Sequence, residues 1–200
     1  MKRTILIALA VAGCAIGGLA AYLMTGGGKP GAPGALSVGK ALVGGPFQLT
    51  DHLGKRVTDK DFRGRYMLVM FGFTFCPDVC PSGLQVMSAA LDKLGKKGEK
   101  ITPIFISVDT ERDTPAQLAQ YVPSFHPRLI GLTGTPQEVD AAAKAYRVYY
   151  KKVRDEKSSA AYTIDHTALI YLMGPDGAYV AHFSHAAGVD VIAERLGKLL

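Results

Sequence analysis

Residues 66–81 read YMLVMFGFTFCPDVCP, an unbroken apolar run that leads directly into a pair of cysteines. The run over 66–73 has the length and composition typical of a strand that is buried on both faces of a sheet. A helix is predicted over 82–94, where apolar residues recur at helical spacing until Gly95. The cysteines are therefore expected between a central strand and a helix.

The rest of the chain alternates strands and helices. A second buried strand is predicted over 101–108, and the pairs Thr114-Pro115 and Thr135-Pro136 are typical of helix starts. Further strands are predicted at 46–49, 55–58, 129–133, 148–153, 168–173 and 178–184, and further helices at 115–121, 136–146 and 190–200. The strands 148–153 and 168–184 are expected to complete the sheet. This order predicts an α/β fold, a thioredoxin-like domain with inserted elements.

The N-terminus predicts a membrane segment. Residues 5–24 carry no charge over 20 residues, which is long enough to span a bilayer as a helix. Lys2 and Arg3 precede the segment, so the positive-inside rule places the rest of the chain outside the cytoplasm, in the periplasm or an equivalent compartment. The predicted domains are an anchor or signal at 1–24, a Gly/Pro linker at 25–35, and a thioredoxin-like domain at 36–200.

Two other interpretations of the N-terminus stay open. A cleaved secretory signal usually has a shorter apolar region, but GGLAA could serve as its cleavage site. The sequence VAGC at 11–14 resembles a lipobox, in which Cys14 would be lipidated. The apolar run continues for ten residues beyond Cys14, so an uncleaved anchor is favoured. All three interpretations export the same domain.

The net charge of +6 arises from 23 basic and 17 acidic residues. Residues 1–35 contain three bases and no acid, so residues 36–200 hold 20 bases and 17 acids, a net charge of +3. This field is too weak to indicate nucleic-acid binding, and no array of basic and aromatic residues is present. A protein or a metal is the expected partner.

Cys76 and Cys80 follow the pattern Cys-x-x-x-Cys, one residue longer than the thioredoxin-type motif. A thiol at the start of a helix lies near free N–H groups that stabilise the thiolate. Two such sulfurs could bind one soft metal ion or, after local adjustment, form a disulfide. A purely structural disulfide is disfavoured, because closing so short a loop constrains the unfolded chain little.

A third ligand is sought in YTIDHT at 162–167, just before a predicted strand and where a thioredoxin-like fold places the loop that faces its cysteines. Two thiolates and the imidazole of His166 suit Cu(I) and, with a weak further ligand, Cu(II). A structural role for His166 is equally open on these grounds. Asp165 is expected to orient this loop or to act from a second shell. Asp78 is expected to cap the helix rather than to tune the thiolates.

Other residues that could ligate copper are assigned ordinary roles. His182 and His185 lie at a strand end and are expected to point to opposite faces. Met67 and Met70 are predicted to be core residues. His126, which precedes a proline in a loop, is expected to be solvated.

Three motifs together resemble the Sco/SenC family, the copper-binding, membrane-anchored proteins of cytochrome c oxidase assembly. They are FGFTFCPDVCP at 71–81, SVDTERDTP at 107–115 and YTIDHTALIYLMGPDG at 162–177. The resemblance implies a thioredoxin-like fold in which Cys76, Cys80 and His166 bind one copper ion. Asp165 matches the family's Asp-His pair. Asp109 and Arg112 fall in the middle motif, and Asp109 is expected to act from a second shell. Thr110 stands where proline is usual.

The resemblance implies a copper metallochaperone that delivers copper to the copper-binding subunit of cytochrome c oxidase. The alternative is a thiol-disulfide oxidoreductase, with Cys76 and Cys80 as its catalytic residues, that reduces the cysteines of the oxidase copper site or senses redox state. Whether the protein is an enzyme is left open. Other copper chaperones or thiol reductants are further expected partners.

Overall fold

The computed structural model describes residues 42–154 and 161–200. Along the chain the strands are β1 (Gln48–Asp51), β2 (Arg56–Thr58), β3 (Tyr66–Gly72), β4 (Ile101–Ser107), β5 (Ile130–Thr133), β6 (Tyr150–Val153), β7 (Thr163–His166), β8 (Leu169–Met173) and β9 (Tyr179–Ser184). The helices are α2 (Val79–Leu94), α3 (Pro115–Tyr121), α4 (Pro136–Ala145) and α5 (Val189–Leu199), with 3₁₀ turns η1 (Asp59–Phe62), η2 (Gly95–Lys100) and η3 (Val122–Ser124).

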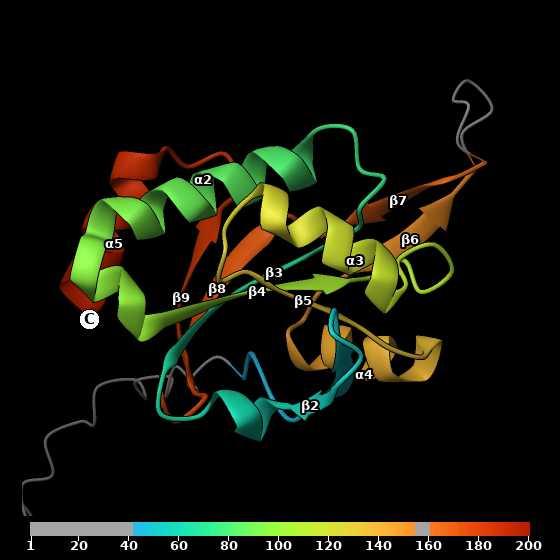
Figure 1. Ribbon diagram of the computed structural model, residues 1–200, viewed down its shortest axis with the longest axis horizontal. Coiled ribbons are helices and arrows are strands. Elements are labelled where there is room, and N and C mark those ends of the chain that lie inside the picture. The colour runs from blue at the N-terminus through green and yellow to red at the C-terminus, as the bar shows by residue number, and fades with distance from the viewer. Residues whose placement is uncertain (1–41, 155–160) are drawn as a thin grey trace, which may run out of the picture. The chain divides into compact units, whose positions relative to one another are not determined.

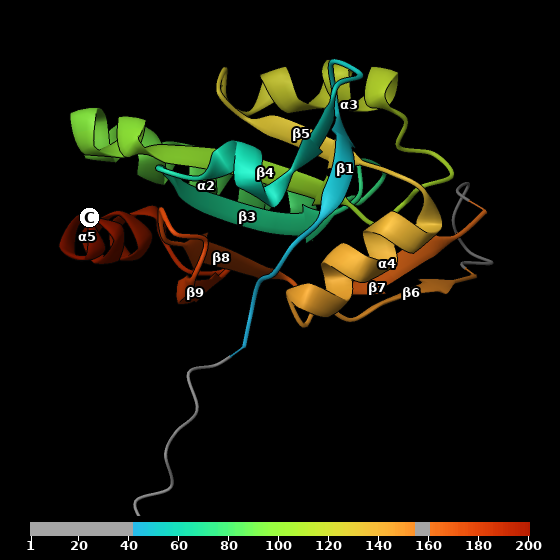
Figure 2. The same ribbon diagram turned by 90° about the horizontal axis from the view of Figure 1, so that it is seen from below.

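Seven strands form one mixed sheet in the order β2-β1-β5-β4-β3-β8-β9. Strands β3, β4 and β5 run parallel, and β8 is antiparallel to β3. Helices α2 and α3 cover one face, α4 covers the other, and α5 packs against α2 (Figures 1 and 2). This confirms the predicted thioredoxin-like α/β fold.

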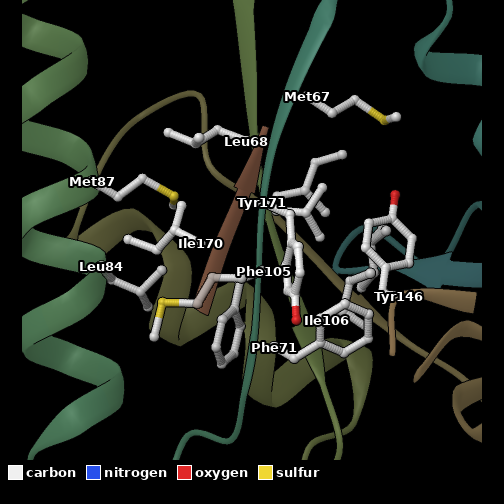
Figure 3. Packing of buried hydrophobic residues seen from close by; sticks show 14 of the residues in the cluster. Met67, Leu68, Phe71, Leu84, Met87, Phe105, Ile106, Tyr146, Ile170 and Tyr171 are labelled. Atoms are coloured by element: carbon white, nitrogen blue, oxygen red, sulfur yellow. The ribbon is translucent and has the colours of Figure 1, made fainter. Parts of the chain in front are cut away.

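The core lies on both faces of β3, whose apolar residues alternate between the two helical layers. Figure 3 shows Leu68 on the side of α2, near Met87 and Leu84, and Phe71 on the opposite side with Tyr146. The rings of Phe71 and Tyr146 lie 5.3 Å apart. Met67 and Met70 are buried, which confirms that they are core residues. Each large side chain of this kind contributes about 1.5–3 kcal/mol on burial.

The predicted strand over 148–153 does not join the main sheet. It is represented by β6, which pairs antiparallel with β7 in a separate two-stranded ribbon, so that Tyr150 lies opposite His166. The stretch 163–166, predicted as a loop, is this second strand. Residues 150–153 have no fully buried position, so they lack the continuous apolar pattern that a place inside the sheet requires.

Helix α2 begins at Val79, three residues before the predicted start. Pro81 lies in its first turn, where a missing N–H is tolerated because the first N–H groups have no partner within the helix. As a result, Cys80 is a helical residue.

No helix within the described ranges is long and apolar enough to cross a bilayer. The predicted anchor, the linker, Cys14 and the boundary at residue 36 lie outside the described residues.

Candidate metal centre

The parallel strands β3 and β4 set the position of this centre. Their carboxyl ends lie side by side, with Gly72 opposite Ser107. The loop after β3 carries Cys76 and leads into α2, which carries Cys80. A Cβ atom on Gly72 would lie 2.6 Å from Cys80 Sγ. Glycine is thus required for the helix to bring Cys80 this close to the strand.

Cys76, Cys80 and His166 come together as predicted. Their ligand atoms all lie within 4.8 Å of one another. In residues 42–154 and 161–200, no other group of three or more His, Cys, Asp or Glu side chains is placed to hold a metal ion. Cys80 Sγ lies 3.3 Å from His166 Nε2, and the Cys80 N–H donates to Cys76 Sγ at 3.4 Å. Both thiols are free and buried.

The two thiols differ strongly in acidity. The hydrogen bond from the Cys80 thiol lowers the pKa of Cys76 to about 4, helped by the N–H groups of Asp78 and Cys80. The same shared proton, together with burial, raises the pKa of Cys80. At neutral pH the pair therefore holds one thiolate, on Cys76, and one thiol, on Cys80.

His166 presents Nε2 to the sulfurs because its other nitrogen is occupied. Nδ1 lies 3.2 Å from the Thr167 carbonyl oxygen, which can only accept, so Nδ1 carries the proton. The lone pair of Nε2 is then free to ligate. The Phe73 ring packs edge-on against the imidazole with centroids 5.9 Å apart, which restricts the rotation of the ring.

This donor set fits a copper ion. Metal bonds of roughly 2.0–2.3 Å, as found for zinc, require donors spaced about as closely as these three. Two thiolate sulfurs and one imidazole nitrogen are soft donors that suit Cu(I), and a further weak ligand extends the set to Cu(II). A fixed imidazole tautomer is typical of a histidine that binds metal.

A pocket of about 440 Å³ opens beside the centre and is lined by Phe73, Cys76, Pro77, Asp78, Val79, Thr163, Ile164, Asp165 and His166. Cys80 is not among the lining residues. An incoming ligand would therefore meet Cys76 and His166 first.

Asp78 occupies the N-cap position of α2, but its side chain makes no capping hydrogen bond. The prediction that this carboxylate caps the helix is wrong. The Cys76 sulfur accepts the Cys80 N–H instead, and the backbone of Asp78, at φ −142° and ψ −71°, is outside the extended region that a capping side chain requires. Asp78 and Asp165 are both exposed at the pocket, and a role for either toward the metal stays a prediction.

Asp109 and Arg112 act together, one step removed from the ligands. The Asp109 carboxylate is buried and accepts from Arg112 Nε and, at 2.7 Å, from the Tyr162 hydroxyl. The Arg112 guanidinium stacks over the Tyr162 ring at 3.8 Å and over Phe73 at 5.8 Å. This cluster ties the cysteine loop to the chain that enters β7 and carries His166.

Asp113 forms a second buried link, which the sequence analysis missed. Its carboxylate accepts from the Thr74 N–H at 2.8 Å, the Thr74 hydroxyl at 2.6 Å and the Ser107 hydroxyl at 2.5 Å. Burial raises its pKa. These bonds fix the loop two residues before Cys76. The sequence did contain a signal for this link. Residues that follow neighbouring parallel strands lie at the same end of the sheet, so Asp113, after β4, could have been expected near the loop after β3.

The histidines set aside in the sequence lie elsewhere. His182 is exposed and contacts the Tyr179 hydroxyl, and His185 Nδ1 lies 3.1 Å from the Ala168 carbonyl oxygen. His126, expected to be solvated, is buried instead with 5% of its surface exposed.

The sequence pattern of the SCO1/SenC family matches residues 37–200. The chain belongs to the SCO1/SenC family. Among curated relatives, the human mitochondrial SCO1 homolog is 50% identical over 149 residues, which are 73% of this chain and 49% of that protein. The SenC protein of Rhodobacter capsulatus is 42% identical over 160 residues, 80% of this chain and 72% of that protein. The chain spans about half the length of the plant and human SCO1 relatives that it matches.

Solved structures of family members share the fold. The crystal structure of Arabidopsis thaliana ScoI with copper bound aligns with a TM-score of 0.74 at 44% identity, covering 78% of this chain and 96% of that one. The structure of Bradyrhizobium japonicum ScoI with copper bound aligns with a TM-score of 0.71 at 50% identity, covering 79% and 99%. BsSco, described as having a disulfide switch and as a member of the Sco family of cytochrome c oxidase assembly proteins, aligns with a TM-score of 0.62 at 25% identity, covering 78% and 92%.

Proposed function

We propose that this protein is a copper metallochaperone that binds one copper ion through Cys76, Cys80 and His166 and delivers it to the copper-binding subunit of cytochrome c oxidase during assembly. The convergence of three soft ligand atoms within 4.8 Å carries the proposal. Copper-bound ScoI structures and the description of BsSco as an oxidase assembly protein support it. Copper is the cargo of this protein.

Ligand exchange fits the geometry of the pocket. Cys76 and His166 line it, so a thiolate of the acceptor protein would approach the copper from their side. The buried sulfur of Cys80 would be the last to be replaced. Because Cys80 loses a proton when copper binds, returning that proton would favour release of the ion.

We further propose that residues 5–24 anchor the protein in a membrane and hold residues 36–200 in the periplasm or an equivalent compartment. The absence of charge over 20 residues and the basic residues before them support this assignment. Other copper chaperones or thiol reductants would load or reduce the centre there.

The low pKa of Cys76 favours a second candidate function, thiol-disulfide exchange. The Cys76 thiolate would attack a disulfide of the target and form a mixed disulfide, releasing one target thiolate. Cys80 would then displace the second target thiolate and close a Cys76–Cys80 disulfide. The target gains two electrons and the pair loses two, so an external thiol reductant must restore the pair.

Replacing His166 separates the two functions. For His166→Ala we expect Cu(I) and Cu(II) affinity to fall about a hundred-fold or more, because a direct ligand is lost. The same variant should still oxidise and reduce its dithiol. His182→Ala, which removes an exposed histidine outside the centre, is the matched control. Unchanged copper affinity in His166→Ala would refute the ligand assignment.

A further inference from the structure

A group of exposed cations lies at the end of the domain opposite the metal centre. Helix α2 begins at the cysteines and runs for 16 residues, about 24 Å, before the chain turns through η2 (Figure 1). Lys96, Lys97 and Lys100 of η2 and Arg65, which precedes β3, are all exposed at this end. We call these four residues the basic pole.

The charges of the basic pole are largely uncompensated. Arg65 donates to the Glu99 carbonyl and the Thr102 hydroxyl, and Lys97 donates to the Gly197 carbonyl at 3.0 Å. These neutral acceptors orient the cations without cancelling their charge.

A hollow of about 550 Å³ separates three of these cations and is lined by Gly64, Arg65, Tyr66, Lys96, Glu99, Lys100 and Pro175. Glu99 is the acid in this lining, so the three cations that line the hollow and this one acid leave a charge of +2. Asp176 follows Pro175 in the neighbouring turn, where its carboxylate accepts the Ala178 N–H. The surface therefore favours an anionic partner.

The first described residues also lie at this end. The Gly44 N–H donates to the Ala145 carbonyl at 2.8 Å, and a Cβ atom on Gly44 would lie 2.2 Å from Met173 Cε. Met173 pairs with Met67 at the amino end of β3, whereas the cysteine loop follows Gly72. The chain therefore enters the domain about 16 Å, five strand residues, from the metal-centre end.

The sequence before this point is short. Seventeen residues, 25–41, separate Met24 from Leu42. A flexible chain of that length has a typical end-to-end distance of about 20–25 Å. If residues 5–24 span a membrane, the basic pole lies within reach of its surface, and opposite charges attract across roughly 10 Å at physiological salt.

We propose that the basic pole docks on anionic lipid headgroups of the membrane that holds residues 5–24, so that the metal centre faces away from the bilayer. This rests on the proposed anchor. The cations lie on long exposed side chains around an open hollow, which suits a field of headgroups better than one enclosed phosphate. Docking would leave Cys76 and His166 open to an acceptor protein.

The test uses the full chain in lipid nanodiscs. The chain contains no tryptophan, so single reporters can be introduced at exposed sites. The first reporter is Val191→Trp. Val191 is exposed on α5 next to Asp190, which pairs with Lys93 near the end of α2 that leads to the basic pole. Tyr149→Trp lies at the other end, where the Tyr149 N–H bonds to Thr167 beside His166. Energy transfer to a dansyl-labelled headgroup reports which end is near the lipid.

In phosphatidylglycerol discs we expect stronger transfer from Val191→Trp than from Tyr149→Trp, and a smaller difference in phosphatidylcholine discs. Adding Lys96→Gln and Lys100→Gln should weaken docking about five-fold for each charge removed. The control pair Lys55→Gln and Lys151→Gln removes the same charge elsewhere and should leave the difference intact. Higher salt should abolish the difference in energy transfer between the two reporters, because it screens the attraction between the lysines and the headgroups.

Equal transfer in the two lipids, or an equal effect of the control pair, would overturn the proposal and leave an acidic protein as the partner of the pole. Copper content is measured on the same discs. Loss of docking with full copper content would overturn only this proposal, whereas loss of copper binding in the parent chain would overturn the metal centre. Failure of the chain to insert into either disc would refute the anchor and the docking together.

Discussion

At the scale of single residues, the centre depends on an unequal division of protons between its two sulfurs. Cys76 is already a thiolate at neutral pH because the Cys80 thiol and the N–H groups of Asp78 and Cys80 stabilise it. Cys80 keeps its proton because it donates to Cys76 and is buried. Copper binding must remove that proton.

We therefore expect copper binding at pH 8, where free imidazole is neutral, to release about one proton rather than two from the cysteine pair. Calorimetry of Cu(I) binding in buffers of different ionisation enthalpy measures this number, after correction for the copper carrier. The exposed-histidine variant His182→Ala should release the same number. Release of two protons would show that Cys76 is not a thiolate before copper binds.

Sequence patterns, together with the family resemblance, located the ligands but not the residues that support them. The spacing of Cys76 and Cys80 was enough to predict a site for a soft metal or a disulfide, whereas the resemblance to the Sco/SenC family was needed to choose His166 as the third ligand over a structural role. The link from Asp113 to Thr74 and the stacking of Arg112 on Tyr162 could not be predicted, because they join segments about 40–50 residues apart through side-chain rotamers. Asp78 misled because its sequence position suits a cap while its backbone does not.

At the scale of elements, the close contact between β3 and α2 defines the centre. A Cβ atom on Gly72 would lie 2.6 Å from Cys80 Sγ and 2.8 Å from the Phe105 ring. Both neighbours are buried and cannot move away freely.

We expect Gly72→Ala to lower the free energy of unfolding by about 1–3 kcal/mol, through overpacking, and to weaken copper binding. Chemical denaturation and copper titration measure the two effects. Gly197→Ala, in α5, is the matched control, because its Cβ would contact the Leu94 side chain of α2 at an ordinary distance of 3.5 Å. Replacing a glycine inside a helix by alanine should stabilise the protein by up to about 1 kcal/mol. Normal stability and affinity in Gly72→Ala would contradict the proposed tight contact.

The loop between η3 and β5 is joined to α2 through His126. His126 Nδ1 accepts the Arg128 N–H at 3.0 Å, and Nε2 lies 3.5 Å from Asp92 of α2. Burial, followed by the charge of Arg128, lowers the pKa of His126 in the folded protein. The neutral ring therefore stabilises the fold above the unfolded pKa of about 6.5, and this contribution is lost as the pH falls through the lower folded value.

We expect the free energy of unfolding to decrease below about pH 6.5 and His126→Gln to reduce this dependence. Urea denaturation from pH 5 to 8 measures it, with His182→Gln, an exposed histidine, as the control. An unchanged pH profile in His126→Gln would exclude a contribution from this ring.

The strand and helix order was predictable because β3 and β4 are unbroken apolar runs and α3 and α4 begin with Thr-Pro pairs. The ribbon of β6 and β7 was not. Ile164 is its one buried residue and it lacks a strong alternating pattern. Its place is fixed by long-range contacts such as Tyr162 with Asp109. The position of His166 thus depends on an element that local sequence did not reveal.

At the scale of the whole molecule, the same two sulfurs serve both candidate functions. Copper binding uses Cys76 and Cys80 as thiolates, whereas reduction of a target joins them in a disulfide. The two states therefore exclude each other. Cys14 lies far from the pair in sequence and belongs to the predicted anchor.

We expect a stoichiometric load of Cu(I) to protect the pair from oxidation by diamide, and prior oxidation to prevent copper binding. In a Cys14→Ser background, Cys76 and Cys80 are the cysteines that can be oxidised. The number of free thiols and the copper content are measured together. His166→Ala should lose the protection while its free pair still oxidises. A protein that retains copper after complete oxidation of both thiols would contradict this competition.

X-ray absorption spectroscopy of the copper-loaded protein identifies the atoms bound to the metal, and it therefore tests the proposed ligands Cys76, Cys80 and His166 themselves. We expect two sulfur neighbours and one imidazole nitrogen in the wild-type protein. In His166→Ala the imidazole signal should disappear while the sulfur signal stays. A copper site without imidazole in the wild-type protein, or an unchanged imidazole signal in His166→Ala, would contradict this set of ligands.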